Sequence, residues 1–386
     1  MRSWYSASGL LAVGFLTYIA CVARHGGRST AQEAKHEACG NVVEWAQRHG
    51  ASFPKLAVTD FFFQLPGEKV SPGLEQTDTR RGDGGATKWF DRIARRRGTM
   101  ATTTIEAGEE VLSVPSAILL SVENARASPE LKRLFDEYGG MMDDYTVLAL
   151  FILREHSKGA QSKFWPYLCS MPRPSDLTTT LYWSKHDLRI ANITAFSYED
   201  RADGRMHQGN LALQTERLRQ LVLHKYNTHV PILLASFPDL FRRDFLNFSS
   251  WTWALTLVYS RNWGVTDPRK TLTSASAHQR TGSGIGAYGR SSHTLVPLAD
   301  LLNHHDPVTD PLSCFLDWRS NGTRMAMIAR RRYERGEEVF TSYGSDCNDR
   351  FLVGYGFAPW PRGHDVRCQR DLRDFSASRV KTGVRE

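Results

Sequence analysis

The chain has 386 residues, of which 41% are hydrophobic and 23% are charged, so it can bury a real core as one large or two smaller globular domains. Its formal net charge of +8 comes largely from local arginine runs, which are typical of solvated faces or of tracks for an acidic protein, nucleic acid or membrane surface. The six cysteines contain no C-x-x-C pair, which excludes a zinc cluster and a dense disulfide scaffold, and no interleaved aromatic stripe supports nucleic-acid binding.

Residues 1–38 read as a hydrophobic targeting segment followed by a polar spacer. After Arg2, residues 3–23 carry no charge, and their apolar core ends in small residues followed by Arg24. This pattern is typical of a signal peptide, and the run is also long enough to span a bilayer as a signal-anchor. A buried core helix is the plainer alternative. Cleavage, membrane anchoring and onward import into a plastid by the secretory route all remain open, and so does the localisation.

Residues 41–120 are expected to form the first folded half of the chain. Apolar residues at helical spacing over 41–49, ended by Gly50, predict an opening helix. The Gly-, Pro- and charge-rich residues 65–88 predict a surface loop. β-branched residues bounded by glycine and proline over 98–115 predict two short strands joined by a turn.

Residues 121–265 read as mostly helical, because several stretches carry apolar residues at helical spacing. The helices predicted there are 130–138, 144–156, 211–226 and 239–258. Two aromatic-rich segments, at 164–168 and 181–184, are expected to pack into the core. Residues 266–293 read as a flexible loop, and residues 361–386 read as a short basic tail.

Residues 294–360 carry two short motifs that together suggest a ligand site. The first is Leu-Ala-Asp-Leu-Leu-Asn-His at 298–304; the second is Gly-Glu-Glu-Val-Phe-Thr-Ser-Tyr-Gly at 336–344, followed by Tyr-Gly-Phe at 355–357. An Asn and a His that close an apolar run offer paired hydrogen-bond donors and acceptors for a polar cofactor. A Tyr beside a Gly lets a ligand approach both the hydroxyl and the bare backbone. The downstream aromatics could wall a pocket for a cationic or apolar group.

Metal binding is not expected at this site. His304, His305, Asp306 and Asp310 are residue types that ligate metals. Without a second ligand group, however, such a cluster reads as an ordinary loop.

This arrangement resembles the SET domain of protein methyltransferases, and most of all the branch that contains the Rubisco large-subunit lysine methyltransferase. The resemblance covers residues 41–360 and is carried by the two C-terminal motifs and by the strand–turn–strand pattern. It implies an α+β fold, in which a SET-type β-fold of short strands is interrupted by a large helical insertion. One departure is Arg96, which stands where the N-terminal motif usually has its first glycine, while Gly98 holds the second place. This departure bears on how closely the backbone there can approach a cofactor.

The resemblance also implies S-adenosyl-L-methionine as cofactor and a protein as substrate. Carried over by motif, Tyr343 would be the catalytic tyrosine, whose hydroxyl orients the substrate amine without acting as a strong base. The residues implied to hold the cofactor are Glu109, Val111, Asn303 and His304. The residues implied to line the substrate channel are Ser260, Arg261, Trp263, Asp300, Tyr355 and Phe357. For Arg261 and Asp300, a structural ion pair is the equally open alternative.

Three functions fit these residues. The first is a protein-lysine N-methyltransferase that uses S-adenosyl-L-methionine. The second is a protein-histidine N-methyltransferase, since a relative in this branch modifies histidine. That relative has a polar Asn near the position of Trp263, whereas Trp263, Tyr355 and Phe357 are all aromatic here and suit an aliphatic cation. The third is a non-catalytic SET-like protein-binding module, which cofactor binding without methyl transfer would indicate.

Overall fold

The computed structural model describes residues 39–64, 93–194, 198–199, 206–207, 211–265, 292–305, 313–344 and 348–358. The hydrophobic segment at 3–23, the loop expected at 65–88, residues 266–291 of the second expected loop and the tail at 361–386 lie outside these residues. Within the described ranges, no helix is both long enough and apolar enough to cross a membrane.

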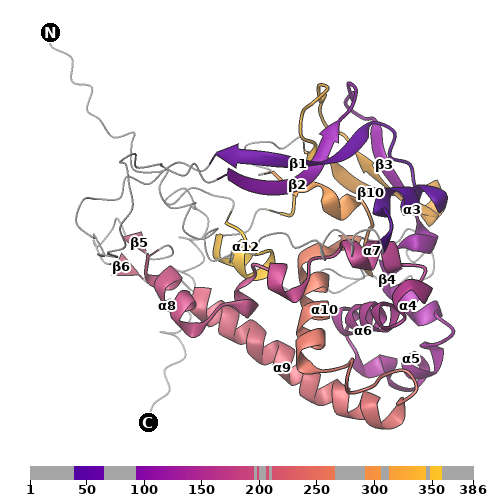
Figure 1. The fold of residues 1–386 in the computed structure, drawn as a ribbon, viewed down its shortest axis with the longest axis vertical. Helices are drawn as coiled ribbons and strands as arrows, with labels where there is room; N and C mark the ends of the chain where they lie inside the picture. Colours follow the sequence, from indigo (N-terminus) through magenta and orange to yellow (C-terminus); the bar gives the residue numbers. More distant parts are fainter. Residues whose placement is uncertain are drawn as a thin grey trace, which may run out of the picture.

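Most of the strands gather on one side of the fold, where they join early and late parts of the chain, whereas the β5–β6 pair lies apart from them beside α8 (Figure 1). The strands are β1 (Leu56–Gln64), β2 (Ile93–Ala101), β3 (Glu110–Pro115), β4 (Leu120–Ser121), β5 (Tyr198–Glu199), β6 (Met206–His207), β7 (Asn262–Val265), β8 (Ser292–Leu295), β9 (Asn303–His304), β10 (Phe315–Arg319), β11 (Arg324–Ile328) and β12 (Phe340–Thr341). One sheet has the order β10-β11-β3 and another the order β4-β8-β7, so early strands pair with late ones in both. The chain between β4 and β7 is therefore an insertion that leaves the sheet region and returns to it.

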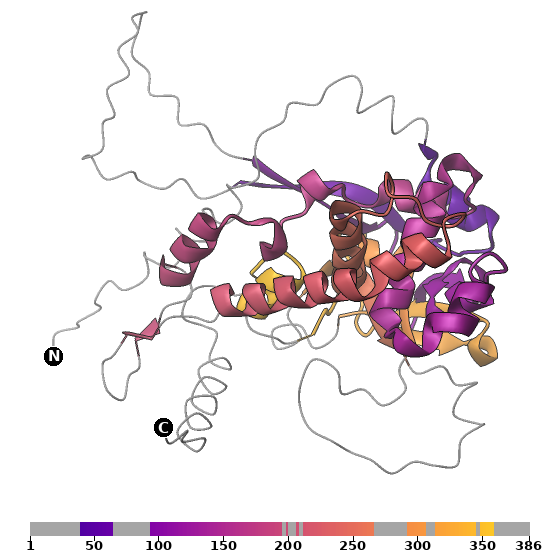
Figure 2. The same ribbon diagram turned by 90° about the horizontal axis from the view of Figure 1, so that it is seen from below.

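Helices make up most of that insertion and cover the other side of the fold (Figures 1 and 2). The helices of the insertion are α4 (Val122–Ala127), α5 (Lys132–Tyr138), α6 (Asp144–Ser157), α7 (Trp165–Ser170), α8 (Lys185–Thr194), α9 (Leu211–Ser236) and α10 (Phe248–Arg261). Outside it, α3 (Val42–Arg48) precedes the strands and α12 (Asn348–Gly354) follows them. Every residue of α6 from Thr146 to Leu153 is buried, and α10 packs against it. Figure 2 shows α9 running along the outside of this helical layer. The insertion thus has a core that is continuous with that of the strands.

The expected fold class is confirmed, with differences at particular elements. The opening helix appears as α3, which begins after Asn41 because the Asn41 side chain accepts from the N–H groups of Val43 and Glu44. The helix expected at 239–258 is wrong over its first part. Asn247 accepts from the N–H groups that follow it and caps α10, so this helix begins only at Phe248.

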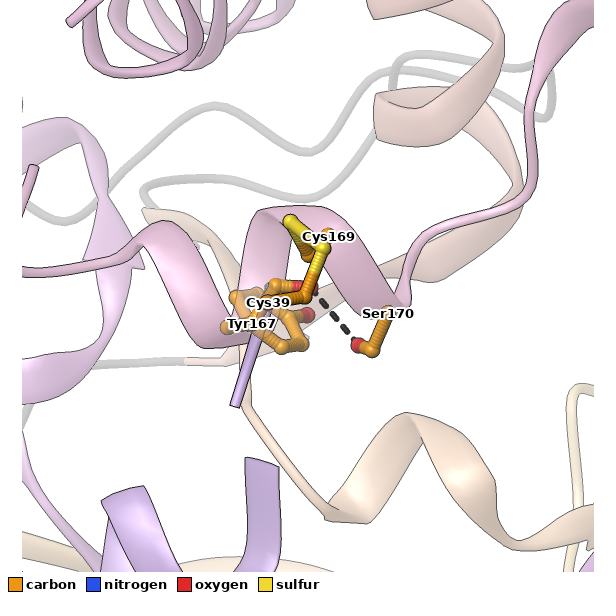
Figure 3. The surroundings of a disulfide bond; sticks show 4 residues. All are labelled: Cys39, Tyr167, Cys169 and Ser170. Carbon is orange, nitrogen blue, oxygen red and sulfur yellow. Dashed lines mark hydrogen bonds between the residues drawn. A yellow bond between two sulfur atoms is a disulfide. The ribbon is translucent and has the colours of Figure 1, made fainter. Parts of the chain in front are cut away.

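A disulfide bond joins the start of the described chain to the insertion (Figure 3). Cys39 precedes α3, and Cys169 lies on α7, with 5.7 Å between their Cα atoms and a sequence separation of 130 residues. Trp45 of α3 also stacks against Tyr167 of α7, with the ring planes 4° apart. The cysteine spacing gave no indication of this pair. Its effect is to fix α7 against α3.

Candidate active site

The two C-terminal motifs lie side by side in a parallel pair of short strands. In this pair, Phe340 of β12 faces Asn303 of β9, and Thr341 faces His304. The backbone N–H of Tyr343 donates a hydrogen bond to His304 Nδ1 at 3.0 Å. Asn303, His304 and Tyr343 are therefore brought together as the motifs predicted.

Asn303 fastens the C-terminal half of the fold to strand β2. Its Nδ2 donates to the backbone oxygen of Arg97 at 2.9 Å and to Glu338 Oε1 at 2.7 Å. A Cβ atom added at Gly98 would lie 2.6 Å from both Asn303 Nδ2 and Glu338 Oε1, so these two side chains would have to shift. Gly98 thus leaves room for the Asn303 amide to reach the Arg97 backbone oxygen and Glu338. Since the amide N–H groups hold two strands together, a cofactor can meet only the amide oxygen and the backbone of Asn303.

Tyr343 has a fixed hydroxyl at the end of the same strand pair. Its Oη donates to the backbone oxygen of Leu302 at 2.7 Å. Tyr355 Oη donates in turn to the backbone oxygen of Tyr343 at 3.3 Å, and the two rings lie 5.0 Å apart. Because the Tyr343 hydroxyl donates its proton to Leu302, a ligand N–H could be bound there only with the oxygen as acceptor.

Aromatic rings surround His304 on several sides. Its ring centroid lies 4.7 Å from that of Phe351, 5.4 Å from that of Tyr343 and 5.9 Å from that of Phe357. Phe351 is fully buried on α12, which Figure 1 shows between the strands and the helical insertion. Tyr355 and Phe357 thus join Tyr343 in one aromatic cluster.

Arg261 and Asp300 form an ion pair, which was the alternative to a substrate-binding role that the sequence left open for these two residues. Arg261 ends α10, and Asp300 lies in the 3-10 turn Ala299–Leu301. Arg261 Nη1 lies 2.9 Å from Asp300 Oδ2 and also donates to the Asp300 backbone oxygen at 3.3 Å. The Asp300 side chain is only 3% exposed, and Tyr167 Oη donates to the same Oδ2 atom at 3.0 Å. Asp300 is therefore a buried carboxylate whose charge Arg261 balances.

Burial and charge act together on the groups around Asp300. Burial by itself would lower the pKa of the Arg261 guanidinium, but the groups around it, above all the Asp300 carboxylate, together outweigh burial and raise the pKa. Burial also raises the pKa of Tyr167 well above its ordinary value, and the nearby Asp300 charge adds to the rise. Arg261 therefore stays charged, and Tyr167 stays a hydrogen-bond donor.

Other residues implied by the family resemblance have contacts of their own. Ser260 Oγ donates to the Thr256 backbone oxygen at 2.7 Å, and Trp263 packs half-buried against the core. The Glu109 carboxylate lies 2.6 Å from Lys55 Nζ, whose hydrogen bond lowers the pKa of Glu109. Val111 of β3 is buried in the core. The geometry leaves the roles of all the predicted site residues as predictions: catalysis for Tyr343, cofactor binding for Glu109, Val111, Asn303 and His304, and substrate binding for Ser260, Arg261, Trp263, Asp300, Tyr355 and Phe357.

Sequence reasoning did not name Tyr167, Glu338 or Phe351 as site residues. Glu338 lies inside the Gly-Glu-Glu motif, and Tyr167 lies in an aromatic segment assigned only to core packing. Phe351 lies between the second motif and Tyr355, where an apolar residue on a short helix reads as packing. All three residues lie in or next to segments that the sequence analysis considered. Each contacts a site residue that is distant in sequence, and this contact can be identified only from the folded structure.

The SET domain family model matches residues 96–344. The chain is 20% identical over 267 residues to ribosomal lysine N-methyltransferase 4 of Saccharomyces cerevisiae, a match that covers 68% of this chain and 49% of that protein. It is 23% identical over 276 residues to human actin-histidine N-methyltransferase, which covers 69% of this chain and 39% of that protein. The chain thus spans about half or less of the length of these two relatives. A crystal structure of the SET domain of LSMT bound to lysine and AdoHcy superposes with a TM-score of 0.56 and 18% identity, over 86% of this chain and 58% of that chain.

Proposed function

The chain belongs to the SET-domain family, and from that premise we propose that it is a protein-lysine N-methyltransferase that uses S-adenosyl-L-methionine. One observation carries the proposal. The Tyr343 side chain lies among aromatic rings at the end of the β9–β12 pair, with its hydroxyl fixed by the Leu302 backbone oxygen. A tyrosine so placed presents an oriented oxygen to a substrate in an apolar, aromatic surrounding.

The residues around this tyrosine fit the cofactor chemically. When bound, S-adenosyl-L-methionine supplies a methyl group carried on a positively charged sulfur. The amide oxygen of Asn303 and the backbone of Asn303 and His304 offer acceptors and donors for its polar groups. The aromatic faces near His304 suit a cation. Asp300 Oδ1 is buried without a hydrogen-bond partner among the described residues, so this site has an unused acceptor.

The chain's own residues have two tasks in the reaction. The aromatic cluster of Tyr343, Tyr355 and Phe357 offers an apolar surrounding, in which desolvation would lower the pKa of a bound lysine and favour its neutral, nucleophilic form. The Tyr343 oxygen accepts a hydrogen bond from the amine and so aims its lone pair. Holding two reactants in line in this way can supply about 7–11 kcal/mol of the barrier at best.

A histidine side chain is the second candidate target, because relatives of both kinds match the chain at similar identity. The predicted place of Trp263 in the substrate channel would favour lysine, since an indole suits an aliphatic cation better than an imidazole that needs polar partners. Amino-acid analysis of the methylated product separates the two. Methylhistidine without methyllysine would overturn the lysine assignment.

The cofactor site is tested by calorimetry with S-adenosyl-L-methionine on the purified wild-type protein and on Asn303→Ala. We expect the variant to bind more weakly by about 5- to 150-fold, which corresponds to the roughly 1–3 kcal/mol lost with a buried polar partner. Asn247→Ala is the matched control, because it removes an Asn side chain that caps α10 away from the site. Equal affinity in all three proteins would refute the assignment of Asn303.

Residues 3–23 are proposed to send the chain into the secretory route or to anchor it in a membrane. Their uncharged composition supports this proposal. So does the Cys39–Cys169 bond, because disulfides persist mainly in oxidising compartments. Alkaline extraction of membranes from cells that express the full chain tests the anchor. Recovery of the protein in the soluble fraction, with residues 3–23 still attached, would refute anchoring.

A further inference from the structure

Tyr167 belongs to the helical insertion, yet its hydroxyl reaches the C-terminal half of the fold. The side chain is fully buried on α7, and its Oη donates to Asp300 Oδ2 across a sequence separation of 133 residues. Helix α7 itself is held in place by the Cys39–Cys169 bond shown in Figure 3 and by the stacking of Tyr167 on Trp45. The hydroxyl is therefore presented to Asp300 from a fixed support.

Asp300 in turn lies in the turn that holds the Tyr343 hydroxyl. The backbone N–H of Leu302 donates to the Ala299 oxygen at 3.2 Å, which closes the turn around Asp300. The Leu302 backbone oxygen then accepts from Tyr343 Oη at 2.7 Å. Contacts thus run without a break from Tyr167 through Asp300 and the turn to Tyr343.

This turn needs support from outside, because its first residue has a strained backbone. Leu298 has a φ of 69°, in the left-handed region that side chains other than glycine rarely adopt. Such a residue persists only where its surroundings hold it in place. The two donors that reach the turn at Asp300 Oδ2, Tyr167 Oη and Arg261 Nη1, provide that restraint.

We propose that Tyr167 is a positioning residue for Tyr343, which it holds in place through Asp300 and the Leu298–Leu302 turn. Tyr167 and Arg261 both bind Oδ2, and Oδ1 has no partner among the described residues. Loss of the Tyr167 hydroxyl therefore leaves Arg261 as the one side chain among the described residues that is seen to restrain the carboxylate. Burial keeps the Tyr167 phenol protonated, so it donates at every working pH. The positional part of the proposal stands on geometry alone, whereas its effect on rate rests on the proposed methyltransferase function.

The positional part is tested by fluorine NMR on protein that carries 3-fluorotyrosine, with the Tyr343 resonance assigned by its absence in Tyr343→Phe. In Tyr167→Phe we expect the Tyr343 resonance to shift or broaden. Tyr182→Phe is the matched control, because it removes a half-buried tyrosine hydroxyl whose contact is Thr256 Oγ1. An unmoved Tyr343 resonance in a folded Tyr167→Phe protein would overturn the proposal. If Tyr167→Phe does not fold, Asp300→Asn must shift the same resonance, and failure to do so overturns it equally.

The effect on rate is tested by a double-mutant cycle between Tyr167→Phe and Tyr343→Phe. We expect Tyr167→Phe to lower kcat by about tenfold in the wild-type background but by less than about twofold in the Tyr343→Phe background, because coupled residues are not additive. The Kd of S-adenosyl-L-methionine should stay the same. Equal losses in both backgrounds would show that Tyr167 does not act through Tyr343. A wild-type protein without methyl transfer would instead refute the proposed function, and the NMR result would still decide the positional claim.

Discussion

Tyr343→Phe should separate catalysis from stability at this site. The change removes a single oxygen, and with it the hydrogen bond to the Leu302 backbone oxygen at 2.7 Å. Such a bond contributes about 1 kcal/mol net to stability, which corresponds to a fall of roughly 2–4 °C in Tm for a large domain. Loss of one preorganised polar group at a reacting centre usually costs far more in rate, about 10²- to 10³-fold or roughly 2.7–4 kcal/mol. We therefore expect a nearly intact fold with turnover reduced at least about a hundredfold.

The assay uses radiolabelled S-adenosyl-L-methionine and a lysate of the source cell as the supply of protein substrates. Tm, cofactor affinity and methyl transfer are measured on the same preparation of the wild-type protein, Tyr343→Phe and Tyr182→Phe. The last variant loses the same atom from the insertion, where Tyr182 Oη lies 3.4 Å from Thr256 Oγ1. It should keep its turnover.

Two results would refute this reasoning. Full activity in Tyr343→Phe would remove the hydroxyl from the mechanism. A clear fall in Tm with an unchanged rate per folded molecule would show that Tyr343 is a structural tyrosine whose ring and hydroxyl only complete the aromatic cluster.

Three further predictions concern the contact between Gly98 and the Asn303 amide, the disulfide and the half-buried His293. Gly98→Ala should lower both Tm and cofactor affinity, measured by scanning fluorimetry and calorimetry, because the new Cβ would lie 2.6 Å from the Asn303 amide; an unchanged Kd would contradict this. A chain that begins at Cys39 should fold and keep its bond to Cys169, whereas Cys39→Ser should lower the free energy of unfolding in denaturant titrations by about 3–5 kcal/mol, given a separation of 130 residues; a loss below about 1 kcal/mol would contradict the disulfide. Burial lowers the pKa of His293 below 6.5, so the unfolded chain takes up a proton first and the fold loses stability as pH falls below that value. His293→Gln should reduce the fall in Tm between about pH 7.5 and about pH 5.5, and an identical fall would show that this histidine does not contribute.

The sequence predicted local elements where the signal is itself local. Helix α3 has a capping Asn41 and apolar residues at helical spacing, and both can be read along the chain. Strand β1 was missed, because the run Phe61-Phe62-Phe63 breaks the alternation of a half-buried strand. That strand is defined by its pairing with β2, and a pairing partner cannot be read from spacing.

The same distinction explains which parts of the site were predicted. The two motifs correctly predicted that Asn303, His304 and Tyr343 lie close together. Family resemblance can predict such a contact between distant segments, whereas the periodicity of apolar residues cannot. Gly98 was also located from its motif. Its physical reason, the Asn303 amide that crosses over it, depends on a hydrogen bond to Arg97 across a separation of 206 residues.

The helical insertion contributes directly to the proposed active site, and this changes how substitutions within it should be interpreted. Of the three groups that meet at Asp300 Oδ2, the insertion supplies Tyr167 and Arg261, and the C-terminal half supplies only the carboxylate. The Asp300 carboxylate is the buried charge of this pair, and among the described residues only Arg261, whose side chain is 25% exposed, is seen to balance it. Removing Arg261 would leave this carboxylate buried without its counter-charge, which typically costs about 3–5 kcal/mol. The site around Asp300 can therefore form only when the insertion has folded against the C-terminal half. The insertion and the C-terminal motifs must then act as one unit.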